Sequence, residues 1–281
     1  MIIWISSYPK SGNTWVRSLL SAYLYSENGI FNFDYLKKIN QFPSKSYFKF
    51  FMKDFTDIKN VSDYWIAAQD RINLNQDVKF FKTHSALCSL AGNSFTNKAN
   101  TKAAIYVVRD PRNVITSFSH HYSINLDEAY KRLINNQFMI YSSEPDHSDF
   151  GTATILGSWS SHYKSWKKIK FAPILIIKYE DLIMDTQKTF LKIINFLSKI
   201  IDVKIDETKI NNVINSCSFE VLSKKENEEG FRESVKSTKD NSIIKFFNMG
   251  KKNKWEKLLD QKIENKIRKE FFEEMKELNY L

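Results

Sequence analysis

The sequence predicts an α/β protein in which a parallel sheet is flanked by helices. The first observation is a set of short apolar runs, each followed by a turn and a longer, often helical segment: residues 2–6, 78–82, 103–108 and 174–178. Strands that are apolar throughout are typical of a parallel sheet covered on both faces. The second observation is that no Gly/Ser-rich or Pro-rich linker interrupts the chain, which has seven Gly and five Pro in 281 residues. We therefore expect a single domain over residues 1–281.

Helical periodicity accounts for much of the remaining chain. Apolar residues recur at helical spacing from Val16 to Leu24, so a helix is expected to begin near Asn13 or Thr14. After residue 185 the pattern is mainly helical, over 186–197 and 255–278. The aromatic segment 31–55 has no clean period, and it is interpreted as a mobile cover rather than a sheet strand.

The charge of the chain restricts its partners without choosing among them. A formal net charge of +10 makes nucleic acid, an anionic membrane surface and a polyanionic small molecule all plausible partners. The run FAPILIIKY is far shorter than the roughly 20 residues that span a bilayer, and the N-terminus lacks the basic region of a signal peptide. We expect a cytoplasmic protein with no integral membrane segment. Cys88 and Cys217 have no metal-ligand spacing, so neither a disulfide framework nor a metal site is expected.

The first candidate site is the loop SYPKSG, residues 7–12, which follows Ser6 and joins the first strand to the first helix. Free backbone N–H groups and the helix dipole converge at such a junction and favour a phosphate group. In a Walker loop a lysine follows the last glycine, and the next hydroxyl holds magnesium. Here Asn13 follows Gly12 and the lysine, Lys10, comes earlier. The loop is therefore expected to bind an anion without the usual lysine and without metal.

The second candidate site is the segment FFKTHSAL, in which Lys82 and His84 are two residues apart at the end of a strand. If the strand continues that far, both side chains point to the same face. Ligand sites in parallel α/β sheets gather at the carboxyl ends of strands, where the loop after the first strand also lies. A single histidine is usually structural, but its position and its partner lysine favour a catalytic role.

The third candidate site is the segment AIYVVRDPRNVITSFSHHY. A strand runs directly into Arg109, and Asp110 followed by Pro111 is typical of a helix N-terminus. This pattern places Arg109 and the early helical residue Ser117 at the same edge of the sheet. They form a second anion-binding element beside the first.

Taken together, these segments resemble the sulfotransferases that use 3′-phosphoadenosine 5′-phosphosulfate (PAPS). YPKSGNTW is similar to their 5′-phosphosulfate loop, KTH to their catalytic segment, and RDPRNVITSFSHH to their 3′-phosphate segment. The segments GSWSSHYKSWKK, IIKYEDL, CSFEVL and FFNMGKKNKW follow in the order of that family. The resemblance implies the P-loop NTPase-like sulfotransferase fold, and transfer of a sulfuryl group from PAPS to a hydroxyl group, or less readily to an amine.

The resemblance also implies roles for individual residues. Lys10 would stabilise the leaving phosphate, Lys82 the transferring sulfuryl group, and His84 would be the general base. The nucleotide would be bound by residues of four segments: Ser11, Gly12, Asn13, Thr14 and Trp15, then Arg109 and Ser117, then Tyr179, and finally Phe219. A sulfuryl group carries less negative charge than a phosphoryl group, so lysines can replace magnesium. The product would be adenosine 3′,5′-bisphosphate (PAP).

One segment departs from the family pattern. The C-terminal element of the family reads Arg-Lys-Gly-x-x-Gly-x-Trp, whereas this chain has Asn248 and Met249 before Gly250. We expect Lys251 or Lys252, together with the Gly250 backbone, to replace the missing cation at the 3′-phosphate.

The acceptor is expected to be a small or lipid-like molecule rather than nucleic acid, held by segments at about 31–75 and 122–156. The aromatic residues there favour a phenol, a lipid or another partly apolar alcohol: Phe31, Phe33, Tyr35, Phe42, Tyr47, Phe48, Phe138 and Tyr141. Two alternatives stay open at this point. One is a P-loop kinase or NTPase that needs magnesium, and the other is a non-enzymatic protein that binds anionic ligands through its net charge.

Overall fold

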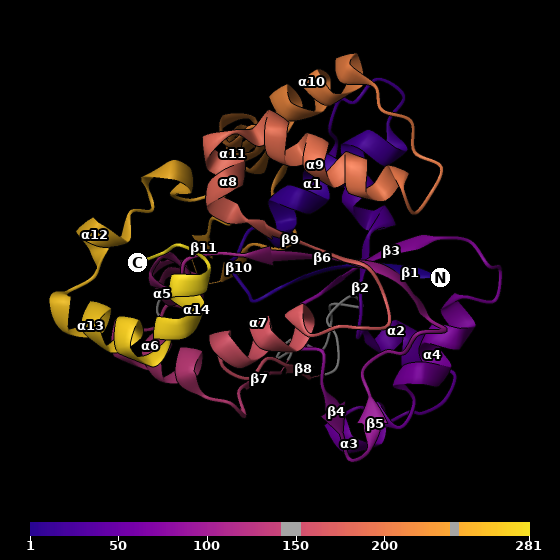
Figure 1. Ribbon diagram of the computed structural model, residues 1–281, viewed down its shortest axis with the longest axis horizontal. Helices are drawn as coiled ribbons and strands as arrows, with labels where there is room; N and C mark the ends of the chain where they lie inside the picture. Colours follow the sequence, from indigo (N-terminus) through magenta and orange to yellow (C-terminus); the bar gives the residue numbers. More distant parts are fainter. Residues whose placement is uncertain (142–152, 237–241) are drawn as a thin grey trace.

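A five-stranded, wholly parallel sheet forms the centre of the molecule, with strand order β2-β3-β1-β6-β9. The computed structural model describes residues 1–141, 153–236 and 242–281. The strands of the sheet are β1 (Ile2–Ser7), β2 (Asn40–Gln41), β3 (Lys79–Thr83), β6 (Thr101–Val108) and β9 (Ile174–Lys178). The parallel α/β architecture expected from the apolar runs is confirmed, with helices above and below the sheet (Figure 1).

One face of the sheet packs against α1 and the helices of residues 179–229, which come directly after β9. Ile3 and Ile5 of β1 lie in this core with Leu19 of α1 and Ile193 of α9, all of them fully buried. The elements of this layer are α1 (Asn13–Tyr25), η1 (Phe33–Lys38), α8 (Tyr179–Met184), α9 (Thr186–Ser198), α10 (Glu207–Ser216) and α11 (Phe219–Glu229).

The opposite face is covered by the remaining helices, including the C-terminal pair. Ile2 and Trp4 of β1 point to this core, where they meet Trp65 and Trp166. The helices of this layer are α2 (Lys45–Phe48), α3 (Ile58–Ser62), α4 (Trp65–Ile72), α5 (Pro111–Tyr122), α6 (Leu126–Ile134), α7 (Trp159–Lys167), α13 (Gln261–Glu270) and α14 (Phe272–Glu277). Because β1 alternates between the two cores, both of its faces are apolar.

Smaller elements lie at the edges. Three short antiparallel pairs are β4 (Ser89–Leu90) with β5 (Asn93–Ser94), β7 (Met139–Ile140) with β8 (Thr154–Ile155), and β10 (Val235–Lys236) with β11 (Ile243–Ile244). The turn η2 (Gly250–Lys252) precedes α12 (Trp255–Leu258).

The interpretation of segment 31–55 as a cover without a strand is wrong at one point. Asn40 and Gln41 pair in parallel with Phe81 and Lys82, so they form the edge strand of the main sheet. A two-residue strand leaves no period-2 signal in the sequence, which is why the pattern did not predict it. In the parts of the chain that the structure describes, no helix is both long and apolar enough to cross a membrane.

Candidate active site

A cavity of about 680 Å³ opens at the carboxyl ends of β1, β3, β6 and β9. The residues predicted from the three segments and from the later motifs meet there. The cavity is lined by Lys10, Gly12, Asn13, Thr14, Trp15, Lys82, His84, Arg109, Ser117, Tyr179, Phe219, Gly250 and Lys251. Two predicted residues do not line it: Ser11 is buried in the loop beneath, and Lys252 is exposed outside.

The loop after β1 has the backbone shape of an anion cradle. α1 begins at Asn13, as expected, and Gly12 before it has a φ of 102°, which a residue with a side chain rarely adopts. A Cβ on Gly12 would lie 2.5 Å from Cδ2 of Tyr179, so only glycine allows this ring to approach. Asn13 donates from Nδ2 to the Ile5 carbonyl at 2.9 Å and so ties the loop back to β1.

Several buried polar atoms at and beside this loop have no hydrogen-bond partner among the described residues. They include Oγ of Ser11, Oδ1 of Asn13 and Nε of Arg109, and also Oγ of Ser6 and the Tyr8 hydroxyl. Such groups usually find a partner when they are buried, because an unpaired donor or acceptor costs free energy. Such a cluster of unpaired polar atoms around one loop is expected where the loop binds a polar ligand.

Arg109 links the β6 end of the site to the loop. Its Nη1 donates to the Lys10 carbonyl at 2.9 Å, and its guanidinium lies 4.2 Å from the centre of the Tyr179 ring. Trp15 donates from Nε1 to the Cys217 carbonyl at 2.9 Å, which fixes the indole beside the start of α11. A wall of planar side chains therefore faces the loop.

The Gly250 turn closes this wall from the C-terminal side. A Cβ on Gly250 would lie 2.7 Å from the Phe219 ring, so this glycine also permits a close approach. Lys251 and Lys252 are both exposed, and Lys251 lines the cavity whereas Lys252 does not.

Hydrogen bonds to its ring fix the tautomer of His84. Nδ1 lies 2.8 Å from the Ser7 carbonyl oxygen, which can only accept, so Nδ1 carries the proton. In the neutral ring Nε2 then keeps its lone pair, and His84 lines the cavity. Burial lowers the pKa of His84 to about 3, with Lys82 adding to the effect, so the ring is neutral at pH 7.

Side chains of helix α7 support the backbone of the segment that carries His84. His162, fully buried, donates from Nε2 to the His84 carbonyl at 3.0 Å, while its Nδ1 lies 2.9 Å from the Tyr106 hydroxyl. Trp166 donates from Nε1 to the next carbonyl, that of Ser85, at 3.0 Å. The motif GSWSSHYKSWKK therefore supplies side chains that fix the backbone on which the His84 ring is carried.

Two lysines in the cavity have lowered pKa values. Burial lowers the pKa of Lys10 to about 7, with Glu233 opposing the shift and Arg109 adding to it. Burial lowers the pKa of Lys82 to about 8, again with Glu233 opposing and Arg17 adding. Both ammonium groups therefore lose a proton more easily than an exposed lysine does. A bound anion would stabilise their charged form.

Sequence reasoning missed an ion-pair cluster in the middle of the site. The carboxylate of Glu233 accepts from Nη1 of Arg17 at 2.6 Å, from the Thr14 hydroxyl at 2.8 Å and from Nζ of Lys82 at 3.2 Å. Burial alone would raise the pKa of Glu233, but Lys82 and Arg17 outweigh it and hold that pKa well below its usual range. Arg17 offered a signal, because an arginine between the apolar residues Val16 and Leu19 needs a buried partner.

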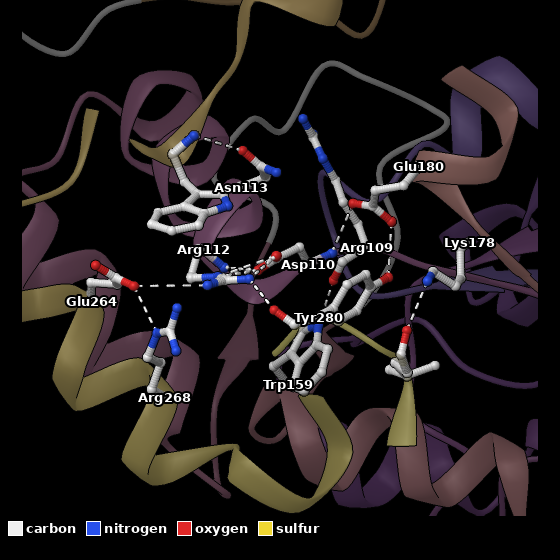
Figure 2. A network of polar contacts seen from close by, with 12 residues as sticks. Arg109, Asp110, Arg112, Asn113, Trp159, Lys178, Glu180, Glu264, Arg268 and Tyr280 are labelled. Atoms are coloured by element: carbon white, nitrogen blue, oxygen red, sulfur yellow. Dashed lines mark hydrogen bonds and ion pairs between the residues drawn. The ribbon is translucent and has the colours of Figure 1, made fainter. Parts of the chain in front are cut away.

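A polar network behind Arg109 joins the end of β6 to the C-terminus (Figure 2). Asp110 caps α5 by accepting from the Arg112 backbone at 2.9 Å, and it also forms an ion pair with the Arg112 side chain at 2.7 Å. Glu180 accepts from the Asp110 backbone at 3.1 Å and from the Tyr280 hydroxyl at 2.9 Å. The helix start after Arg109 is therefore the predicted Asp-Pro cap, tied to the last residues of the chain.

The model of the sulfotransferase domain matches residues 2–279. The chain belongs to the sulfotransferase family. It is therefore an enzyme of a family that transfers sulfuryl groups, as the motif order implied.

Curated relatives and solved structures agree with this membership. Human sulfotransferase 1C2 is 24% identical over 261 residues, covering 89% of this chain and 75% of that protein. Luciferin sulfotransferase of Photinus pyralis is 25% identical over 227 residues, covering 78% and 55%. Mouse sulfotransferase SULT7A1, crystallised with PAP, superimposes with a TM-score of 0.57 at 18% identity, covering 98% of this chain and 84% of that one. Retinol dehydratase with androsterone and PAP gives 0.59 at 17% identity, covering 98% and 80%.

Most of the aromatic residues expected around the acceptor of this sulfotransferase lie elsewhere. Phe31, Phe42 and Phe48 are buried in the two cores, each at most 2% exposed. Of the eight named in the sequence, Tyr47 and Tyr141 line the cavity. Part of the second expected acceptor segment, residues 142–152, lies outside the described residues.

Proposed function

We propose that this sulfotransferase moves the sulfuryl group of PAPS to a hydroxyl group of its acceptor, with His84 as general base. The observation that carries the proposal is the His84 tautomer: Nδ1 is committed to the Ser7 carbonyl, so Nε2 is the atom that can take a proton in the cavity. Lys82 lines the same cavity two residues earlier.

The residues present fit the donor nucleotide. The unpaired atoms of Ser11, Asn13 and Arg109 and the two close glycine approaches form a polar cradle beside planar rings. Relatives of the same fold were crystallised with PAP. The donor supplies an activated sulfuryl group, and this chain supplies the positions and charges around it.

Each segment then has a task. Thr14 and the backbone of Ser11 to Thr14 hold the 5′-phosphate at the start of α1. Arg109 and Ser117 hold the 3′-phosphate, with Gly250 and Lys251 closing over it. Trp15 and Phe219 pack on the adenine, and Tyr179 contacts the nucleotide between them.

The chemical step follows from the same placement. His84 takes the proton of the acceptor hydroxyl on Nε2 as that oxygen bonds to sulfur. The bond between sulfur and the bridging oxygen breaks, and PAP leaves with the electron pair. Lys82 stabilises charge on the sulfuryl group, and Lys10 stabilises charge on the departing phosphate.

The magnesium-dependent kinase alternative has less support. The residue at the Walker lysine position, Asn13, donates its amide to the Ile5 carbonyl and serves the loop itself. A non-enzymatic anion binder would explain the cations but not the fixed tautomer of a buried histidine.

The test is transfer of ³⁵S from labelled PAPS by the parent and by His84→Ala, with Asn211→Ala on the exposed side of α10 as control. We expect His84→Ala to lose at least about a hundredfold in rate while PAP affinity stays within about twofold, because a general base acts on the acceptor. Near-parental turnover by His84→Ala would mean that the base lies elsewhere.

A further inference from the structure

The order of the sheet divides the cavity into a donor side and an acceptor side. The segments assigned to the nucleotide follow β1, β6 and β9, which lie next to one another. Lys82 belongs to β3, on the other side of β1, and His84 follows it. Beyond β3 lies only β2 in this sheet of the described chain, with Gln41 directly opposite Lys82. An acceptor that reaches His84 from the side away from the nucleotide therefore lies against β2 and the residues after it.

The acceptor side carries amide and hydroxyl side chains beside the ring of Tyr47 and Ile140 of β7. β2 and its following loop contribute Asn40, Gln41, Ser44 and Ser46 to the cavity lining, and β8 contributes Thr154. Amides and hydroxyls both donate and accept hydrogen bonds. The neighbouring Phe42 and Phe48, which the sequence suggested for an apolar acceptor, point into the core instead.

The polar part of this lining favours an acceptor with several hydroxyl groups, and the rings beside it can contact the face of a sugar. A phenol or a sterol would displace water from these polar groups and return few hydrogen bonds. Sites that bond substrate hydroxyl groups favour substrates that carry them over analogues that lack them. A molecule with a hydroxyl on nearly every carbon satisfies both the donors and the acceptors of such a wall.

A second cavity continues from the acceptor side toward the surface. Its volume is about 730 Å³, and it shares Asn40, Ser46 and Tyr47 with the first cavity. It extends to Phe50, which is 70% exposed, with the Arg71 guanidinium 4.1 Å from its ring centre. An acceptor of one ring would occupy the first cavity alone, whereas an acceptor with several linked rings would extend into the second.

We propose that the acceptor is a saccharide of more than one ring, which presents a ring hydroxyl to Nε2 of His84. Further rings lie along Asn40 and Ser46 toward Phe50, whose exposed aromatic surface suits the apolar C–H face of a sugar. This inference rests on the proposed function and names the substrate class of the same site.

The test compares acceptor classes with one labelled donor. The chain is incubated with ³⁵S-labelled PAPS on a glycan array and, in parallel, with 2-naphthol, dehydroepiandrosterone and tyramine. We expect label on array glycans that share a terminal ring. Gln41→Ala and Ser46→Ala should each lose about tenfold in labelling, since each removes a side chain that bonds the sugar, and Asn211→Ala should match the parent. Phe50→Ala should weaken labelling of longer glycans more than that of monosaccharides.

Two further measurements show whether a loss of labelling comes from misfolding, from the donor site or from the acceptor site. Melting temperatures show that the variants fold, and calorimetry with PAP separates loss of the donor site from loss of the acceptor. A parent that does not bind PAP contradicts the proposed function, and the acceptor inference with it. If PAP binds, label on the phenol, sterol or amine with a blank array overturns the saccharide inference alone. A blank array with no product at all, or glycan labelling that Gln41→Ala and Ser46→Ala leave unchanged, overturns it as well.

Discussion

The carboxylate of Glu233 lies 2.6 Å from Nη1 of Arg17, although the two residues are 216 positions apart in the chain. The other oxygen of Glu233 accepts from the Thr14 hydroxyl, the group assigned to the 5′-phosphate of the donor. The Glu233 carboxylate therefore bonds the hydroxyl group that, in the proposed function, binds the 5′-phosphate. Its negative charge would oppose binding of the donor.

We expect Glu233→Gln to bind PAP about tenfold more tightly, because it removes one charge that repels the 5′-phosphate but keeps a side chain of the same size. The free variant should melt at a lower temperature, since Arg17 loses its charged partner, and saturating PAP should restore much of the loss. Calorimetry and thermal melts measure both effects. Glu229→Gln, at the exposed end of α11, is the control. Unchanged or weaker PAP affinity in Glu233→Gln would show that the carboxylate does not compete.

The two buried lysines predict that PAP binding weakens at alkaline pH. Burial lowers the pKa of Lys10 to about 7 and that of Lys82 to about 8, so both lose their charge as the pH rises through this range. A bound anion favours the charged form and raises both pKa values, so binding above pH 7 takes up protons. Affinity should therefore fall steadily from pH 7 to pH 9.

Calorimetry at pH 8 in phosphate and in Tris buffer checks the sign. The observed enthalpies should differ in the direction of proton uptake by the protein. Proton release, or an affinity that does not change between pH 7 and pH 9, would contradict the lowered lysine pKa values. Lys10→Arg should reduce the uptake, since arginine stays charged throughout.

His162 is expected to act as a positioning residue for His84. His162→Ala leaves the His84 carbonyl without its donor, so kcat should fall about tenfold or more while KM for PAPS and PAP affinity change little. His162→Gln places an N–H near the same point and should recover part of kcat. A merely structural role would instead lower PAP affinity and melting temperature together, with no rescue by glutamine.

The sequence predicted four of the five strands of the main sheet and the motif positions, because these depend on local pattern. Asp110 and Pro111 specify their own helix start, and the strand before Arg109 is apolar throughout, so neighbouring residues were sufficient. Glu233 could not be predicted in the same way, because its partners are set by tertiary proximity alone. The sequence also could not assign the aromatic residues between Phe31 and Phe48 to an acceptor pocket or to a core, and three of them lie in the core.

At the C-terminal turn, Lys251 lies on the cavity wall and Lys252 lies outside it, so the two lysines form a matched pair of variant and control. Lys251→Ala should weaken PAP binding by about one decade, the value of a charged hydrogen bond to phosphate, whereas Lys252→Ala should bind like the parent. Arg109→Ala, at the principal 3′-phosphate contact, should lose more than either. Equal affinities for both lysine variants and the parent would show that the turn closes the site without replacing the missing cation.

The proposed function requires a site for a sulfuryl-donor nucleotide that works without magnesium. Titration of the chain with PAP and with ATP, each with magnesium and with a chelator, tests this most directly. We predict that PAP binds at least about a hundredfold more tightly than ATP and that the chelator leaves its affinity unchanged, because the proposed function assigns Arg109 and Lys251 to the 3′-phosphate and the cavity lysines to the charge at the 5′ end. Magnesium-dependent binding of ATP, with no heat on addition of PAP, would contradict it.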